Sequence, residues 1–255
     1  MAEAASSGGV QSVSRVLDVL EAVAAAGGEL ALSEIASASG VPLPTVYRLA
    51  RTLVDRGYMR QLPNRRYALG SRLIPLGEVA GAMLGTWARP VLEGLVSELG
   101  ESANLAALDG DRAVYIGQVP STHSMRMFTE VGRRVNLHST GVGKAILSLL
   151  PDEEVRALVA RAGMPAQTPH TITDPDEFIT ALHRTRRDGY AMDEGEQEIG
   201  VRCVAFPVAG ATSRMAVSVS GPAGRMTPAL VERAIPLLSK ASETLAAELA
   251  ERPSA

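Results

Sequence analysis

The segment Leu137–Ile146, LHSTGVGKAI, contains residue types that bind phosphate at the start of a helix. A nucleotide-binding Walker loop requires a glycine, four intervening residues, and then Gly-Lys followed by Ser or Thr. Here His138 occupies the position of the first glycine, and Ala145 follows Lys144 where the hydroxyl that holds Mg²⁺ would be. The segment therefore does not predict a nucleotide site.

The same segment still predicts a site for a smaller anion. A helix is expected to begin near Gly141, and the unpaired N–H groups and positive dipole at a helix start favour an anion. Glycines let a ligand approach the backbone closely, and a carboxylate suits so short a site. An equally open interpretation is that Ser139 or Thr140 only caps the helix, while the glycines allow close packing. Lys144 is expected one residue past the site, on the outer or interface side of the helix, without a ligand role.

The chain that positions this segment has 255 residues, a formal net charge of −3 and one cysteine, Cys203. This length allows one large domain or two modest ones. The apolar content is ordinary, no apolar run is long enough to span a bilayer, and the N-terminus lacks the pattern of an export signal. A single cysteine excludes an internal disulfide framework and fits a reducing cytoplasm, which is the predicted location.

Charge is distributed unevenly along the chain. Between Val41 and Arg72 there is one acid, Asp55, against seven arginines. Because the total charge is negative, the rest of the chain is net acidic. A basic module on an acidic body is typical of a polyanion-binding head, although a basic run is also common on a solvated face. The seven are Arg48, Arg51, Arg56, Arg60, Arg65, Arg66 and Arg72.

Two short helices joined by a tight turn are predicted in this basic region. The first begins at Leu32 with Ser33 as its cap and ends at Gly40, and the second covers Thr45–Arg56. This is the helix-turn-helix pattern, whose second helix enters the major groove of DNA, and a three-helix cap with surface arginines is the alternative. The residues expected to face DNA are Pro44, Thr45, Tyr47, Arg48 and Arg51.

A basic hairpin is predicted directly after the second helix. Tyr58–Leu62 and Arg66–Leu69 are short β-prone runs on either side of a Pro-Asn-Arg turn. Arg65 and Arg66 lie at or near the tip. A basic hairpin beside a recognition helix forms a winged helix, whose wing contacts phosphate or the minor groove.

The remainder of the chain combines helices with a sheet. A largely apolar helix is expected over Ser71–Leu84, and a helical connector can transmit rotation whereas a Gly/Ser tether cannot. Short apolar or alternating runs from Ser102 onward predict strands, and helices occur between them without regular βαβ alternation. The sequence therefore predicts an α+β domain. The expected strands cover 102–109, 112–119, 125–131, 203–210 and 214–221.

The segments SVSRVLDVLEAV, LSEIASASGVPLPTVYRLARTLVDRGYMRQ and RYALGSRLIPLG resemble the DNA-binding half of the IclR family of bacterial transcriptional regulators. The resemblance extends from about Gln11 to Glu251. It implies a winged helix-turn-helix domain over 10–70, a linker helix over 71–86, and an effector-binding domain with a GAF/profilin-like α+β fold over 87–252. It also implies a repressor that binds a palindromic double-stranded DNA operator as a homodimer or homotetramer.

The resemblance further implies one pocket for a small organic acid such as glyoxylate, pyruvate or an allantoate-type metabolite. Gly141 and Val142 would contribute backbone N–H groups, and Ser218 depends on strand register. An acid beside the ligand carboxylate must be protonated or must bind a ligand hydroxyl or amide. The implied contacts are Met127, Gly141, Val142, Asp193, Val201, Cys203, Ser218 and Ser220.

Two of these residues also have ordinary structural interpretations. Cys203 lies in an apolar run that is typical of a buried side chain, and Asp193 belongs to an acidic cluster typical of a solvated loop. Two further hypotheses are an enzyme with Cys203 as nucleophile and His138 or His123 as base, and a metal sensor using His138, Asp193 and Cys203. Neither a nucleophile turn nor metal-ligand spacing supports them. We therefore expect no enzymatic activity, cofactor or metal.

Overall fold

The computed structural model describes residues 10–84, 86–126, 129–209 and 214–251. The chain divides into two compact units, Met1–Ala80 and Gly81–Ala255. In the described part of the chain, none of the helices combines the length and the apolar run that crossing a membrane would require. Each unit has a hydrophobic core of its own, so each is described separately.

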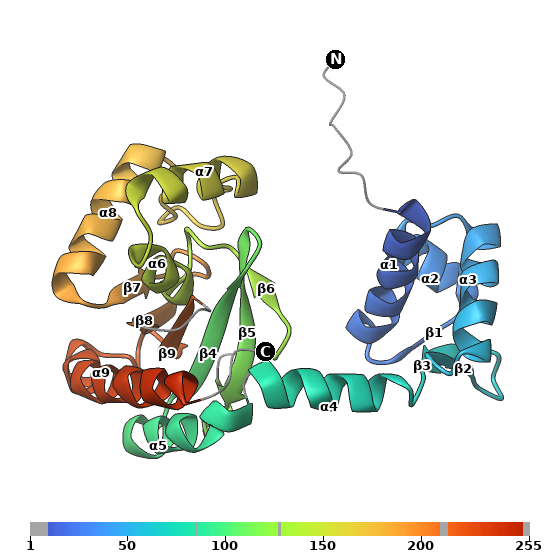
Figure 1. Ribbon diagram of the computed structural model, residues 1–255, viewed down its shortest axis with the longest axis horizontal. Helices are drawn as coiled ribbons and strands as arrows, with labels where there is room; N and C mark the ends of the chain where they lie inside the picture. Colours follow the sequence, from blue (N-terminus) through green and yellow to red (C-terminus); the bar gives the residue numbers. More distant parts are fainter. Residues whose placement is uncertain (1–9, 85, 127–128, 210–213, 252–255) are drawn as a thin grey trace. The chain divides into compact units, whose positions relative to one another are not determined.

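The first unit is a helix-turn-helix with a small sheet (Figure 1). Its core comes from the apolar stripes of the three helices together with the hairpin, and includes Val19, Val23, Ile35, Val46, Leu53 and Met59. The elements are α1 (Gln11–Ala25), β1 (Glu29–Leu30), α2 (Leu32–Ser39), α3 (Leu43–Asp55), β2 (Met59–Gln61) and β3 (Tyr67–Leu69), followed by α4 (Leu73–Leu84).

The turn between α2 and α3 is made by residues with special backbone requirements. Gly40 ends α2 in the left-handed conformation at φ 67°, and Pro42 precedes α3. The predicted cap at Ser33 is wrong, because α2 already begins at Leu32. Instead the Glu34 carboxylate accepts a hydrogen bond from the Ala31 N–H at 2.8 Å, which lowers the Glu34 pKa. Alanine has no side-chain acceptor, so only this half of a capping box exists.

The predicted hairpin is confirmed, and a third strand that was not predicted joins it. β2 and β3 pair antiparallel with Met59 opposite Leu69, and β1 pairs with the other edge of β3. Gly70 closes the hairpin where the backbone folds back on itself. A Cβ atom at Gly70 would lie 2.1 Å from the Gly57 carbonyl oxygen, so only glycine fits there.

The second unit is an α+β domain, as predicted, built on one antiparallel sheet of order β6-β5-β4-β9-β8-β7. Its strands are β4 (Ser102–Asp109), β5 (Arg112–Val119), β6 (Arg134–Val135), β7 (Ala191–Glu194), β8 (Val201–Val208) and β9 (Met215–Pro222). Its helices are the short 3-10 helix η1 (Thr86–Ala88) and α5 (Arg89–Leu99), α6 (Gly141–Ser148), α7 (Asp152–Ala162), α8 (Pro175–Asp188) and α9 (Pro228–Ala250).

The two faces of this sheet are covered by different helices (Figure 1). Helices α5 and α9 cover one face, where large side chains such as Val204 and Val217 alternate inward. Helices α6 to α8 cover the other face, where the sheet contributes small residues including Ala106, Ala205 and Ala216. Small side chains let α6 approach the sheet closely. The predicted site lies on this second face.

Two strand predictions differ from the structure. The described residues of 125–131 form no strand, and the edge of the sheet is instead β6, a two-residue strand paired with β5. Strand β7 was not predicted, because its sequence AMDE reads as part of an acidic loop. The Asp193 side chain binds the following turn, and the backbone pairs with β8.

Candidate functional site

A small pocket lies at the start of α6, beside strands β5, β7, β8 and β9. Its cavity volume is about 50 Å³. Since a cavity of about 10–15 Å³ holds one water molecule, the pocket suits a ligand of a few non-hydrogen atoms. Of the residues predicted as effector contacts, five line it: Gly141, Asp193, Val201, Cys203 and Ser220.

The first turn of α6 presents backbone donors to this pocket. Thr140 is the N-cap, and its hydroxyl accepts a hydrogen bond from the Gly143 N–H at 3.1 Å while donating to the Asn136 carbonyl at 2.7 Å. Helix geometry gives the N–H groups of Gly141 and Val142 no acceptor within the helix. Unpaired N–H groups at a helix start are able to bind an anion.

The glycines of this segment are required by packing. A Cβ atom on Gly141 would lie 2.9 Å from the Cys203 sulfur, and one on Gly143 would lie 2.2 Å from the Leu137 carbonyl oxygen. The cap and the close packing considered for this segment are therefore both present. They coexist with a pocket that reaches the Gly141 backbone, and ligand binding there stays a prediction.

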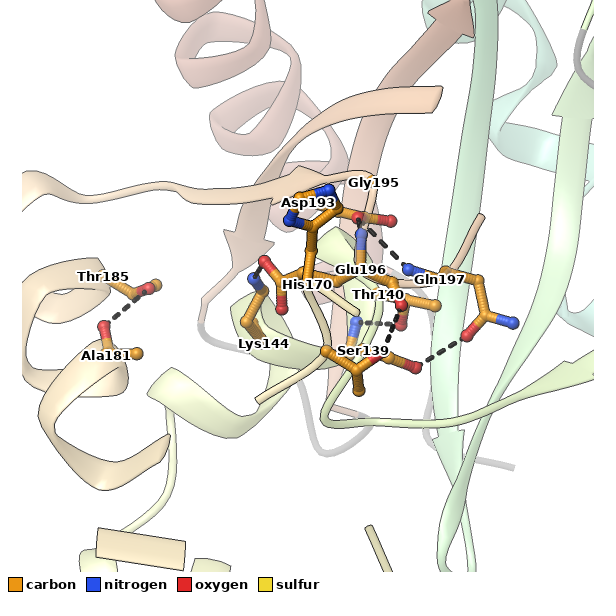
Figure 2. A network of polar contacts seen from close by, with 12 residues as sticks. Ser139, Thr140, Lys144, His170, Ala181, Thr185, Asp193, Gly195, Glu196 and Gln197 are labelled. Carbon is orange, nitrogen blue, oxygen red and sulfur yellow. Dashed lines mark hydrogen bonds and ion pairs between the residues drawn. The ribbon is translucent and has the colours of Figure 1, made fainter. Parts of the chain in front are cut away.

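Asp193 is buried, with 3% of its surface exposed, and does not lie in a solvated loop. Its Oδ1 accepts hydrogen bonds from the N–H groups of Glu196 at 2.7 Å and Gln197 at 3.4 Å (Figure 2). Burial raises the pKa of Asp193 to about 6, against the opposing effects of the Glu196 N–H and the Lys144 charge. A carboxyl with this pKa is readily protonated beside an anion.

Strand register decides which polar residues reach the pocket. Cys203 on β8 lies between Asp193 on β7 and Ser220 on β9, so these three side chains form one row. Ser218 pairs with Ala205 one step further along the sheet and is buried behind the row. Ser218 is therefore not a lining residue. The Val142 side chain packs in the core beneath α6 and is absent from the lining, while the contact predicted for Val142, its backbone N–H, stays a prediction. Met127 lies outside the described residues.

Seven further lining residues were not predicted. Two of them carried a local signal in the sequence. Arg133 is a basic residue in the segment that precedes α6, where an anion site was predicted, and Thr140 is the N-cap of α6. Tyr115 faces the pocket from β5, and burial raises the pKa of its hydroxyl. Its position depends on the sheet order, which no local pattern reveals. The seven are Tyr115, Thr129, Arg133, Val135, Thr140, Gln197 and Glu198.

Of the two positions expected for Lys144, the outer or the interface side of its helix, the outer side is wrong. Lys144 is buried, and its Nζ forms an ion pair with Glu196 Oε1. Figure 2 shows this pair beside the Ser139–Gln197 hydrogen bond, in which the Ser139 hydroxyl donates to Gln197 Oε1 at 2.6 Å. The helix start is thus joined to the β7–β8 turn by one charged and one neutral contact.

Four of the seven residues predicted to contact DNA line a groove of the first unit. Pro44, Tyr47, Arg48 and Arg65 line it, and Gln61 on β2 contributes as well. Arg51 is exposed one turn further along α3, whereas Thr45 is half-buried. Arg65 occupies the wing turn with φ 63°, a left-handed conformation that is uncommon for a residue with a side chain.

Arg66 differs from the other predicted DNA contacts in having partners within the protein. Its Nη2 donates to Glu34 Oε2 at 2.8 Å, and its Nε lies 3.4 Å from Glu29 Oε1. Asn64 Oδ1 also accepts a hydrogen bond from the Arg66 N–H at 3.0 Å. These contacts fasten the base of the wing to the start of α2.

Geometry opposes the enzyme and metal hypotheses. Burial raises the pKa of the Cys203 thiol to about 12, so it is not a thiolate nucleophile at neutral pH. His138 Nε2 is bonded to the Pro165 carbonyl at 3.1 Å, and burial lowers the His138 pKa. Among the described residues, no three His, Cys, Asp or Glu side chains gather as metal ligands.

Comparison with known proteins agrees with this architecture. Residues 12–63 match the IclR helix-turn-helix domain, and residues 79–247 match the model described as bacterial transcriptional regulator IclR C-terminal. The transcriptional repressor IclR of Escherichia coli (strain K12) is 36% identical over 234 residues, covering 89% of this chain and 85% of the relative. The acetate operon repressor of Salmonella typhimurium (strain LT2) is 36% identical over 227 residues, covering 86% and 83%.

A solved structure is similar over nearly the whole length of both chains. It is the IclR transcriptional regulator from Alicyclobacillus acidocaldarius, which has a TM-score of 0.81 and 30% sequence identity and covers 94% of this chain and 98% of that one. These relatives are regulators rather than enzymes, and the matched N-terminal domain is a DNA-binding one. The chain belongs to the IclR family of bacterial transcriptional regulators.

Proposed function

We propose that the protein is a repressor whose binding to a palindromic operator changes when a small organic acid occupies the pocket at the start of α6. The single observation that carries the proposal is that one chain holds both a basic winged helix-turn-helix and a buried polar pocket at a helix start. A DNA-binding regulator acts where the chromosome is, so the cytoplasm is its proposed location.

DNA recognition is assigned to α3 and the wing. Arg48 is exposed on the second turn of α3 and has the length and fork geometry to bind a guanine edge. Tyr47 and Pro44 would lie against sugar or thymine methyl groups, and Arg51 and Arg65 against phosphate. Because several arginines take part, operator affinity is expected to fall steeply with salt.

The effector is assigned to the pocket with its carboxylate toward α6. The N–H groups of Gly141 and Val142 would bind the carboxylate, and Asp193 and Ser220 would bind a second polar group or share a proton with the acid. The cavity of about 50 Å³ favours a two- or three-carbon acid such as glyoxylate or pyruvate over a larger allantoate-type metabolite.

Coupling between the two functions requires a connector with two arrangements. We assign residues 10–70 to the DNA-binding domain, 71–86 to a linker helix, and 87–252 to a GAF/profilin-like effector domain. The acid shifts the equilibrium between arrangements only by its difference in affinity for them. Helix α4 lies within the proposed linker and is nearly continuous in apolar residues.

The proposed dimer has a candidate surface. Val13 and Leu17 on α1 expose 55% and 51% of their surfaces, and Leu76 and Val79 on α4 expose 55% and 61%. Exposed apolar side chains at helical spacing mark an interaction surface more often than solvent. We assign them to contact with a second copy of the chain, since a two-fold dimer matches a palindromic site.

The test is a selection of bound duplexes from a random-sequence DNA pool, followed by titration of short carboxylic acids against the selected duplex. We expect an inverted repeat to be enriched, and at least one two- or three-carbon acid to change the affinity of the protein for it. Enrichment of no sequence would contradict the DNA-binding assignment. Operator binding unaffected by every acid would contradict the effector assignment alone.

A further inference from the structure

A buried ion pair lies next to the proposed effector pocket and is not explained by it. The exposed fractions of the Lys144 and Glu196 side chains are 6% and 10%. Burying two charges is costly, and replacing such a pair with apolar residues of similar size often leaves a protein equally stable or more stable. The stability of the fold therefore does not account for the charges.

The pair joins two elements that both contribute to the pocket wall. Lys144 extends from the second turn of α6, and Glu196 lies in the turn 195–200 between β7 and β8. Gln197 and Glu198, the next two residues of that turn, line the pocket. Movement of the turn would therefore move one wall relative to the backbone N–H groups of α6.

The other contacts of this turn fix its shape and its far side. Asp193 accepts the N–H groups of Glu196 and Gln197, which folds the turn on itself. The hydroxyls of Thr168 and Thr171 donate to the carbonyls of Gly195 at 2.7 Å and Glu196 at 2.6 Å. On the pocket side, Figure 2 shows two contacts toward α6, the Lys144–Glu196 pair and the Ser139–Gln197 hydrogen bond.

Glu196 also depends on Lys144 for its charge. Its Oε2 has no hydrogen-bond partner among the described residues, so Lys144 is the group that compensates the buried carboxylate. Removing Lys144 alone would leave an unpaired buried charge, which strongly destabilises a protein. A test of position rather than of folding must therefore change both residues together.

We propose that Lys144 and Glu196 are positioning residues for the effector pocket: their ion pair holds the β7–β8 turn against the first turns of α6 and so fixes the place of Gln197 and Glu198 in the pocket wall. The proposal rests on the proposed function only in treating this pocket as the effector site. Neither residue is required to touch the acid.

The test replaces both charges with apolar groups of similar length, Lys144→Met with Glu196→Met, in the full chain. The matched control removes the exposed Arg156–Asp176 pair between α7 and α8, as Arg156→Met with Asp176→Asn. Two readouts need no effector. One is hydrogen–deuterium exchange of the peptide covering 194–198, and the other is the labelling rate of Cys203, the chain's single cysteine and a pocket-lining residue, by a small neutral thiol reagent.

We expect the double variant to keep its melting temperature. The amides of 194–198 should exchange at least about tenfold faster than in the native chain, and Cys203 should be labelled at least about tenfold faster, because both rates rise when the pocket wall opens locally. The control should change neither rate. Unchanged exchange and labelling in the double variant would overturn the proposal, as would faster exchange with an unchanged Cys203 rate. If the double variant does not fold, Lys144→Leu with Glu196→Leu, which also removes both charges together, is measured and judged by the same two rates.

Acid titrations separate this proposal from the proposed function. Where glyoxylate or pyruvate binds the native chain, its affinity should fall at least about tenfold in the double variant, and an unchanged affinity would overturn the positioning role. If neither acid binds the native chain, the effector assignment fails, whereas the exchange and labelling rates still decide whether the pair holds the turn.

Discussion

Tyr47, Arg48 and Arg65 of the first unit project into solvent from a helix and a hairpin, whereas Asp193, Cys203 and Ser220 of the second unit are buried beneath α6. The exposed set makes no contribution to a core. The buried set crosses strands β7, β8 and β9 on one face of the sheet, and the Asp193 carboxylate is hydrogen-bonded to the turn that follows β7.

This difference predicts how mutations will act in each unit. On the exposed surface, a substitution should remove function and leave the free energy of unfolding nearly unchanged. In the pocket, the same atoms position the backbone and meet the ligand, so stability and binding should change together.

Gly143→Ala should be the most damaging change at the buried site. The added Cβ atom would lie 2.2 Å from the Leu137 carbonyl oxygen, and backbone cannot move aside as a flexible side chain can. We expect a loss of about 3 kcal/mol or more in the free energy of unfolding, measured by urea denaturation. Ligand binding should be lost with it.

The control for this change is Gly94→Ala in α5, where nothing lies within 4 Å of the added atom. Glycine weakens a helix interior, so the control should gain about 0.5–1 kcal/mol of stability. Equal effects at the two glycines would mean that α6 does not approach Leu137 as closely as the structure shows.

Arg48→Ala tests the exposed side of the comparison. Loss of a bidentate base contact costs about 1–3 kcal/mol, so operator affinity should fall roughly five- to 150-fold. The urea midpoint and any acid affinity should stay as in the native chain. Arg184→Ala, an exposed arginine of α8, serves as the control and should affect neither. Equal loss of DNA and acid binding in Arg48→Ala would contradict the division into two functional units.

The same distinction explains how far the sequence alone could go. Helices α3 and α9 and strands β4, β5, β8 and β9 follow from apolar periodicity and turn residues, because each pattern is local. Asp193, Cys203 and Ser220 could be proposed only through the family resemblance. Their common row depends on the pairing of β7 with β8 and of β8 with β9, and pairing between distant segments leaves no local trace.

Lys144 shows why its position in the interior of the domain could not be predicted. A lysine near a helix start is usually solvated, and nothing within the segment Leu137–Ile146 indicates a buried partner. Its partner, Glu196, is far along the chain in a turn that reads as an acidic loop. The correct interpretation required knowing that this turn folds onto α6, which is a tertiary property.

Asp193 makes the buried pocket sensitive to pH. Its folded pKa of about 6 is raised above the ordinary value of 3.8, so the folded state holds this proton more tightly than the unfolded state does. The stabilisation is therefore present below pH 4 and is lost as pH rises through about 6. A shift of this size corresponds to about 3 kcal/mol. Binding of an acid anion should weaken over the same range, because Asp193 becomes charged.

Measuring both quantities against Asp193→Asn isolates this group from other titrations. Between pH 4 and pH 7, the free energy of unfolding of the native chain should fall relative to that of the variant. The affinity of the variant for a short acid should be nearly independent of pH over that range. A native acid affinity that rises above pH 6 would exclude a charge conflict between Asp193 and the ligand.

Substitutions of Arg66 should have the smallest effect. They test a residue that belongs fully neither to the exposed DNA-facing set nor to the buried pocket set. It was predicted to contact DNA, yet its guanidinium pairs with Glu34 and Glu29. Pairs this exposed contribute about 0.2–1 kcal/mol, so Arg66→Glu or Glu34→Arg alone should weaken operator binding by only about two- to fivefold if the pair positions the wing. The reversed pair, Arg66→Glu with Glu34→Arg, should then restore affinity and leave the salt dependence unchanged. If Arg66 instead contacts a phosphate directly, the reversed pair should not restore operator affinity, because a glutamate at position 66 repels the phosphate whichever residue stands at position 34. The slope of log affinity against log salt concentration would then fall by about one.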